Sequence, residues 1–164
     1  MNATAEATYI GNFEMRDPDG SVRPVTNIEM ETLARKKRAK QPFLYIAGPY
    51  TKPDPVENTH RMIRIADELL SLDVVPVVPH LTMFWHLLRP HPYEHWLAYD
   101  LQLMSRCDIV LRVPGESSGA DREVIDAERL GIPVIHPATT DECVSAVREW
   151  LETVPAFLQF QRSA

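Results

Sequence analysis

The chain of 164 residues carries a formal net charge of −6, and 45% of its residues are hydrophobic. A chain of this size can bury one hydrophobic core, and it needs no second domain. The acidic balance argues against a general nucleic-acid-binding protein, because duplex binding depends on clustered Lys and Arg that neutralise phosphates. The composition favours a small-molecule ligand instead.

Targeting signals and cysteine patterns bear on where such a chain works. Cys107 and Cys143 lie far apart and lack the spacing of metal ligands. The N-terminus does not read as a signal peptide, and the chain has no run of about eighteen apolar residues. We therefore expect a soluble protein in a reducing, cytoplasmic setting, with no membrane partner.

The first forty-one residues, 1–41, form a predicted N-terminal extension. Thr8–Met15 and Ser21–Thr26 flank the turn sequence Asp17-Pro18-Asp19-Gly20, which predicts a hairpin. A polar helix is expected to follow, from about Asn27 to Lys40.

A basic cluster, Arg35-Lys36-Lys37-Arg38, falls on this expected helix. It could contact phosphate or nucleic acid, but in an acidic protein a solvated helix face is the favoured interpretation. We assign it no chemistry. The main domain is predicted to span residues 42–164.

From Phe43 onward, short apolar runs alternate with helical stretches, a pattern typical of an α/β fold. The predicted elements, in chain order, are strand Phe43–Ala47, helix Glu57–Leu72, strand Val74–Val78, helix Tyr93–Arg106, strand Asp108–Val113, helix Gly119–Leu130, strand Pro133–His136 and helix Asp141–Leu151. Uninterrupted apolar strands suit a parallel sheet that is covered on both faces. The pattern predicts a doubly wound, flavodoxin- or Rossmann-like open sheet.

Ligands of such folds bind at the carboxyl ends of the strands. Two glycine-bearing loops should meet there, residues 48–52 after the first core strand and residues 114–119 after the third.

The segment Ser117-Ser118-Gly119-Ala120-Asp121-Arg122-Glu123 is the most informative stretch, because it follows an apolar strand and opens a helix. Backbone N–H groups at a helix N-terminus attract anions, and small residues let a ligand approach them. Glu123 is a candidate nucleophile in this pocket. The alternative is that Ser117 or Ser118 caps the helix and that Glu123 is a first-turn glutamate complementing the helix dipole.

Three segments together resemble the nucleoside 2-deoxyribosyltransferase superfamily, which includes nucleoside 5'-monophosphate N-glycosidases. They are Tyr45-Ile46-Ala47-Gly48-Pro49-Tyr50, Asp100 eight residues before Asp108, and Ser117-x-Gly119-x-x-x-Glu123. The resemblance covers roughly residues 43–136. It implies a flavodoxin-like enzyme that cleaves or transfers at the bond between a base and C1' of a sugar.

The resemblance also implies the roles of two carboxylates. Glu123 matches the family's nucleophilic glutamate, which stabilises or traps the oxocarbenium ion formed as the base leaves. Asp100 matches an aspartate near the sugar hydroxyls and the attacking group. Its alternative is an exposed helix carboxylate. We expect Glu123 to be ionised near neutral pH, helped by the helix N-terminus.

The expected substrate-binding residues come from the two loops. They are Gly48, Tyr50, Thr51, Lys52, Ser117, Ser118, Gly119 and Asp121. Ser117 and Gly119 match phosphate donors of the 5'-monophosphate hydrolases. Thr51 stands where those hydrolases place an arginine, and Lys52 could replace it only as a point charge. The sequence therefore leaves nucleoside and nucleotide substrates both open.

No metal is expected, because the histidines between residues 80 and 95 form no HExxH pattern and have no nearby Cys pair. No cofactor is expected either. A homo-oligomer is expected by resemblance, with Phe84, Trp85, Trp96 or residues 157–160 as contact material. Two other readings stay open: a non-catalytic nucleotide sensor that uses the same pocket, and a redox flavodoxin. The proline-containing loop of residues 48–53 weakens the latter, since it lacks donors for an FMN phosphate.

Overall fold

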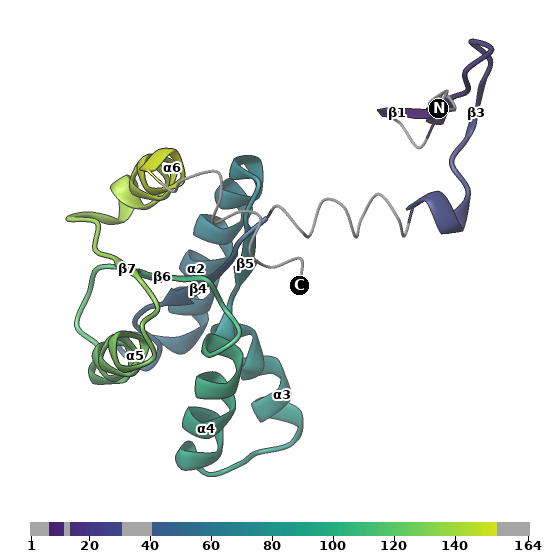
Figure 1. Cartoon of the computed structure of the whole chain (residues 1–164). Helices are drawn as coiled ribbons and strands as arrows, with labels where there is room; N and C mark the ends of the chain where they lie inside the picture. The colour runs from purple at the N-terminus through teal and green to yellow at the C-terminus, as the bar shows by residue number, and fades with distance from the viewer. Residues whose placement is uncertain (1–6, 12–13, 31–40, 154–164) are drawn as a thin grey trace. The chain divides into compact units, whose positions relative to one another are not determined.

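The structure is a computed structural model that describes residues 7–11, 14–30 and 41–153. The chain divides into two compact units, Met1–Lys40 and Gln41–Ala164 (Figure 1). In the described residues, no helix is long and apolar enough to cross a membrane.

The first unit contains a three-stranded antiparallel sheet in the order β1-β2-β3. The strands are β1 (Thr8–Gly11), β2 (Glu14–Arg16) and β3 (Val22–Pro24). The turn between β2 and β3 is closed by the Gly20 amide, which donates to the Asp17 carbonyl at 2.9 Å. This hairpin lies where the sequence predicts one, but the predicted segment of residues 8–15 is divided into two strands.

Arg23 is the main polar link of this unit. Its guanidinium pairs with Asp17 at 2.8 Å and with Glu29 at 2.6 Å. Residues 27–30 are helical, as expected for the start of the polar helix. The rest of that predicted helix, with its basic cluster at residues 35–38, lies outside the described residues.

The second unit is built on a four-stranded parallel sheet in the order β5-β4-β6-β7. Its strands are β4 (Phe43–Ala47), β5 (Val75–Val77), β6 (Ile109–Arg112) and β7 (Val134–Ile135). In Figure 1 they run from right to left in that order. The unit is an α/β fold, as expected, and it is compatible with a Rossmann- or flavodoxin-like arrangement.

Helices connect these strands. They are α2 (Pro55–Leu69), α3 (Thr82–Leu88), α4 (Tyr93–Met104), α5 (Ser118–Arg129) and α6 (Cys143–Thr153), with 3-10 turns η1 (Leu70–Leu72), η2 (Pro79–Leu81) and η3 (Thr140–Glu142). Helix α2 begins two residues before its predicted start, because Asp54 caps it by accepting from the Val56 and Glu57 amides.

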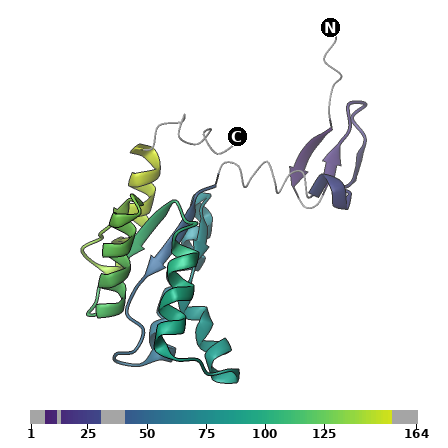
Figure 2. The ribbon, with the colours of Figure 1, turned by 60° about the horizontal axis from the view of Figure 1, so that its bottom comes forward.

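The alternation of side chains along β4 separates two hydrophobic layers. Leu44 and Ile46 pack in one cluster with residues of α2 and α6, whereas Tyr45 and Ala47 pack in another with residues of α4 and α5. All four side chains are completely buried. Helices therefore cover both faces of the sheet (Figure 2).

The strand order creates a crevice at one edge of the sheet. From β4 the chain passes through α2 to β5 on one side, and it returns to β6 on the other side of β4. The loops after β4 and β6 consequently diverge at the carboxyl ends of their strands. This is the switch point at which ligands of open parallel sheets bind.

Candidate active site

A cavity of about 740 Å³ opens at this switch point, between the loops after β4 and β6 and the helices α3, α4 and α5. It contains all but one of the residues predicted for the site. Those present are Gly48, Tyr50, Thr51, Lys52, Asp100, Ser117, Ser118, Gly119 and Glu123.

Glu123 lies in the second turn of α5, and its side chain enters the cavity. The hydroxyl of Tyr45, from the middle of β4, donates a hydrogen bond to Glu123 Oε1 at 2.6 Å. The first-turn reading of Glu123 is wrong, since the acidic residue of the first turn is Asp121. Glu123 is instead a partly buried carboxylate held by a buried phenol.

The surroundings of Glu123 raise its pKa to about 7. Burial is the largest cause of the increase, and Asp100 adds to it, while the Tyr45 hydrogen bond and Arg112 oppose it. This value departs from the expectation that Glu123 is ionised near neutral pH. Burial outweighs the helix N-terminus, so the carboxyl group is divided between its two protonation states at pH 7.

Asp100 reaches the same cavity from α4, on the side of the sheet that Tyr45 faces. Its Oδ1 atom is buried and has no hydrogen-bond partner among the described residues. Burial raises its pKa to about 6. Asp100 is therefore not the exposed helix carboxylate of the alternative reading, and one of its oxygens can accept from or donate to a ligand.

Helix α2 fixes the first loop, residues 48–53. Buried Asn58 donates from Nδ2 to the carbonyl oxygens of Tyr50 and Lys52, both at 2.8 Å. A Cβ atom on Gly48 would lie 2.6 Å from Sδ of the buried Met62, so the loop needs glycine there in order to pack on the helix.

His80, on the turn η2 after β5, holds this loop from the other side. Its Nε2 atom lies 3.0 Å from the Pro49 carbonyl oxygen. Its ring meets that of Tyr50 edge-on, with centroids 5.8 Å apart. Burial lowers the pKa of His80, so the ring is neutral at pH 7 and Nε2 donates to the carbonyl.

The second loop ends in the N-terminus of α5. Ser117 caps the helix, because its Oγ accepts from the Ala120 amide at 3.2 Å. The capping alternative therefore describes this serine correctly, although its hydroxyl hydrogen can still donate into the cavity. A Cβ atom on Gly119 would meet nothing closer than Tyr93 Oη at 3.5 Å, so packing does not demand glycine there.

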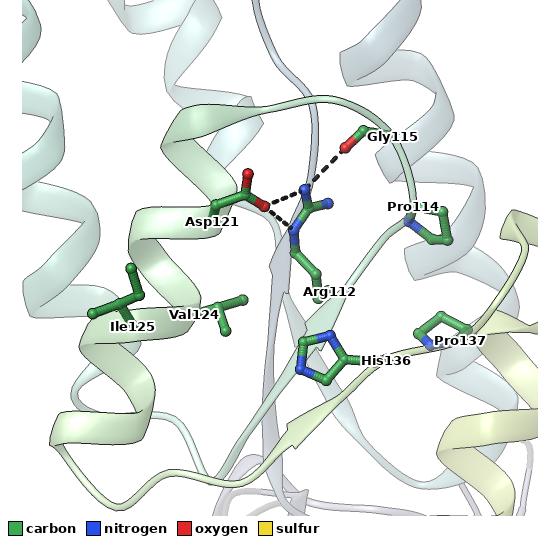
Figure 3. Close-up of a pocket in the computed structure, with 8 residues that line it drawn as sticks. All are labelled: Arg112, Pro114, Gly115, Asp121, Val124, Ile125, His136 and Pro137. Carbon is green, nitrogen blue, oxygen red and sulfur yellow. Dashed lines mark hydrogen bonds and ion pairs between the residues drawn. The ribbon is translucent and has the colours of Figure 1, made fainter.

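Asp121 is the predicted site residue that this cavity does not contain. It lines a second pocket of about 430 Å³, shown in Figure 3, where it pairs with Arg112 at 2.7 Å. On helix α5, Gly119 and Glu123 are four residues apart and share a face, whereas Asp121 lies between them and points away from that face.

Aromatic side chains from α3, from α4 and from the loop between them line part of the cavity. Trp96 Nε1 donates to His86 Nδ1 at 2.8 Å, and His91 stacks on His95 with ring centroids 4.2 Å apart. Both His86 and His91 line the cavity, together with Tyr93. Among the described residues, no cluster of three or more His, Cys, Asp or Glu could hold a metal ion.

The sequence analysis gave Tyr45 and Asn58 no role in the site, and it placed Trp96 only in the expected subunit contact. The signal for Tyr45 is its place in an otherwise apolar, fully buried strand, since a buried phenol needs a polar partner. The bonds of Asn58 to the first loop and of Trp96 to His86 depend on how neighbouring elements pack, so they could not be placed without the fold.

The chain belongs to the family described as Domain of unknown function (DUF7768), which matches residues 42–136, more than half of the chain. The matched range spans β4 to the residue after β7 and includes every residue of the candidate site. No match to a curated protein was found.

Proposed function

We propose that this protein cleaves or transfers at the N-glycosidic bond of a nucleoside or nucleotide through a glycosyl intermediate on Glu123. The observation that carries this is the pairing of Glu123 with the Tyr45 hydroxyl at 2.6 Å in a cavity shared with Asp100. The resemblance to nucleoside 2-deoxyribosyltransferases, and a flavodoxin-like reading of the fold, support the same conclusion.

In the first step of this mechanism, the Glu123 carboxylate attacks C1' as the bond from C1' to the base nitrogen breaks. The electron pair leaves with the base, which takes up a proton from water. Tyr45 holds Oε1, so Oε2 is the oxygen that bonds to the sugar. A carboxylate that is poorly solvated in the free protein is a stronger partner for the developing oxocarbenium ion.

In the second step, water or an acceptor base attacks C1' and Glu123 leaves as a carboxylate. Asp100 accepts the proton of the attacking group, because its ionised form is available above a pKa of about 6. Its unpartnered buried oxygen supports this role.

The direct test is a chromatographic assay of free base released from a panel of nucleosides and their 5'-monophosphates, with and without an acceptor base. Wild-type protein should release base, and Glu123→Gln should lose at least about 1,000-fold in rate. Glu128→Gln is the matched control, because Glu128 is an exposed glutamate on the same helix. Full turnover by Glu123→Gln would refute the mechanism.

The panel also separates the forms of the activity. Release from 5'-monophosphates alone would identify a nucleotide N-glycosidase and make Ser117 a phosphate ligand. Base exchange on nucleosides would identify a transferase.

A second candidate function is a nucleotide sensor that binds without turnover. The pKa of about 7 for Glu123 favours it in one respect, because the protonated carboxyl group could donate to a bound ligand. Saturable ligand binding without base release across the whole panel would support the sensor over the enzyme.

A further inference from the structure

Arg112, the last residue of β6, folds its side chain back along the loop that follows it. Its Nη2 atom donates to the Gly115 carbonyl at 2.9 Å, and Nη1 donates to the Val113 carbonyl. Nε and Nη2 both donate to Asp121 Oδ1, at 3.2 and 2.7 Å. One guanidinium thus joins the strand end, the loop and the first turn of α5 (Figure 3).

Two effects oppose a guanidinium group at this position. A positive charge beside a helix N-terminus is disfavoured by the helix dipole. The Arg112 side chain is also only 11% exposed, so it has lost most of its hydration. The Asp121 carboxylate and two loop carbonyls offset both effects, because together they accept hydrogen bonds from all three guanidinium nitrogens.

The loop that Arg112 contacts lies against the first loop of the site. Gly115 has a φ of +132°, and a Cβ atom there would lie 2.7 Å from Pro49 Cγ. The position of this loop therefore depends on close backbone packing on one side and on Arg112 on the other. Ser117, which caps α5, follows two residues later.

We propose that Arg112 is a positioning residue of the site: with Asp121 it fixes the loop after β6 to the first turn of α5. It thereby sets the positions of Ser117, Gly119 and Glu123 without contacting the substrate. The catalytic consequence rests on the proposed function, whereas the effect on the loop does not.

The charge of Arg112 has a second consequence for Glu123. The groups that act on this carboxyl group are Tyr45 from β4, Asp100 from α4, Arg112 from β6 and Asp126 from its own helix. Arg112 and the Tyr45 hydrogen bond favour the ionised form, and both acids oppose it. Removing Arg112 should therefore raise the pKa of Glu123.

The test compares Arg112→Met and Asp121→Asn with a matched control, Arg122→Met, which removes an exposed cation from the neighbouring position of the same turn. The first readout is amide hydrogen exchange at Ala120 and Asp121, whose N–H groups bond to Ser117 at 3.2 and 3.0 Å. Exchange in β4 serves as the internal reference for global unfolding.

We expect both variants to increase exchange at these two amides about tenfold, with β4 and the control unchanged. Unchanged exchange in both variants would overturn the proposal, whether or not the protein is an enzyme. If Arg112→Met fails to fold, Asp121→Asn still decides, because Asp121 is 65% exposed and its substitution leaves the core intact.

The second readout is the pH profile of base release. Arg112→Met should move the acid limb to higher pH, whereas Asp121→Asn, which keeps the cation, should lower the rate without that movement. Identical profiles in the two variants would contradict the effect of the Arg112 charge on the pKa of Glu123. Absence of base release in the wild type would count against the proposed function, and the exchange result would stand by itself.

Discussion

Tyr45 and Glu123 are 78 residues apart in the chain, yet they form the shortest polar contact of the candidate site, at 2.6 Å. A completely buried phenol requires a partner for its hydroxyl group, and a carboxylate in a cavity requires a donor. Each residue therefore supplies what the other lacks. Burial and the nearby Glu123 raise the pKa of Tyr45 well above its usual value, so it remains a donor throughout the working pH range.

Substitution of Tyr45 by Phe tests this contact. The Tyr45 hydrogen bond lowers the pKa of Glu123, so Tyr45→Phe should raise that pKa and move the acid limb of the activity profile to higher pH. The rate at neutral pH should fall about tenfold, as expected for one lost hydrogen bond to a charged group. Tyr99→Phe is the control, because Tyr99 packs edge-on against Trp85 and Trp96 and makes no hydrogen bond to Glu123 among the described residues. An unchanged profile in Tyr45→Phe would contradict this role.

The raised pKa of Glu123 also predicts how stability depends on pH. Between the ordinary pKa of 4.5 and the folded-state pKa of about 7, the folded protein binds more protons than the unfolded chain. Stability should therefore fall as pH rises through this window. Glu123→Gln should remove this loss. Between pH 4 and pH 8, the free energy of unfolding of wild type should therefore fall by about 1–3 kcal/mol more than that of Glu123→Gln. Thermal unfolding across pH measures it, and parallel curves for the two proteins would refute the assignment.

At the scale of elements, side chains of neighbouring elements fix the two loops of the site. Asn58 and His80 fix the loop after β4, and Arg112 fixes the loop after β6. Of these three side chains, His80 also lines the cavity, whereas Asn58 and Arg112 do not. Such preorganisation suits a site that must hold charge in a fixed geometry.

The two glycines of these loops should respond differently to alanine. Gly48→Ala places a Cβ atom 2.6 Å from the buried Met62 sulfur, so it should destabilise the fold by about 1–3 kcal/mol. Gly119→Ala finds room, and alanine is the better helix former, so its unfolding temperature should not fall. Base release by Gly119→Ala should nevertheless decrease, because its Cβ atom faces the cavity. Equal loss of stability in both variants would contradict the packing argument.

The sequence predicts the elements better than their contacts. The predicted strand Phe43–Ala47 matches β4 residue for residue, because a short apolar run bounded by Pro42 and Gly48 has few other interpretations. Helix α3 was missed, since its seven residues are too short to show a period and follow a proline-containing turn. Asp121 was expected in the substrate pocket, and only the fold shows that the rotation of α5 directs it to Arg112.

At the scale of the whole molecule, the site belongs to the second unit alone. Every cavity residue lies between residues 48 and 123, and both hydrophobic clusters consist of residues from 44 onward. This unit contains its own core on both faces of the sheet, which is the requirement for independent folding.

A chain comprising residues 41–164 should therefore fold and retain the activity of the full protein. We expect its unfolding temperature to lie within about 3 °C of the second unit's transition in the full chain. Calorimetry and the base-release assay measure the two properties. A truncated chain that unfolds well below this temperature, or loses the activity, would show that the first unit supports the site.

The central claim is that Glu123 forms a covalent bond to the sugar. The most direct measurement is mass spectrometry of acid-quenched protein after reaction with nucleosides and nucleotides that carry fluorine at C2', which slows both steps by destabilising the oxocarbenium ion. The account predicts a burst of free base and a sugar adduct on the peptide that contains Glu123, absent in Glu123→Gln. A burst of base from wild-type protein whose Glu123 peptide stays unmodified would contradict it.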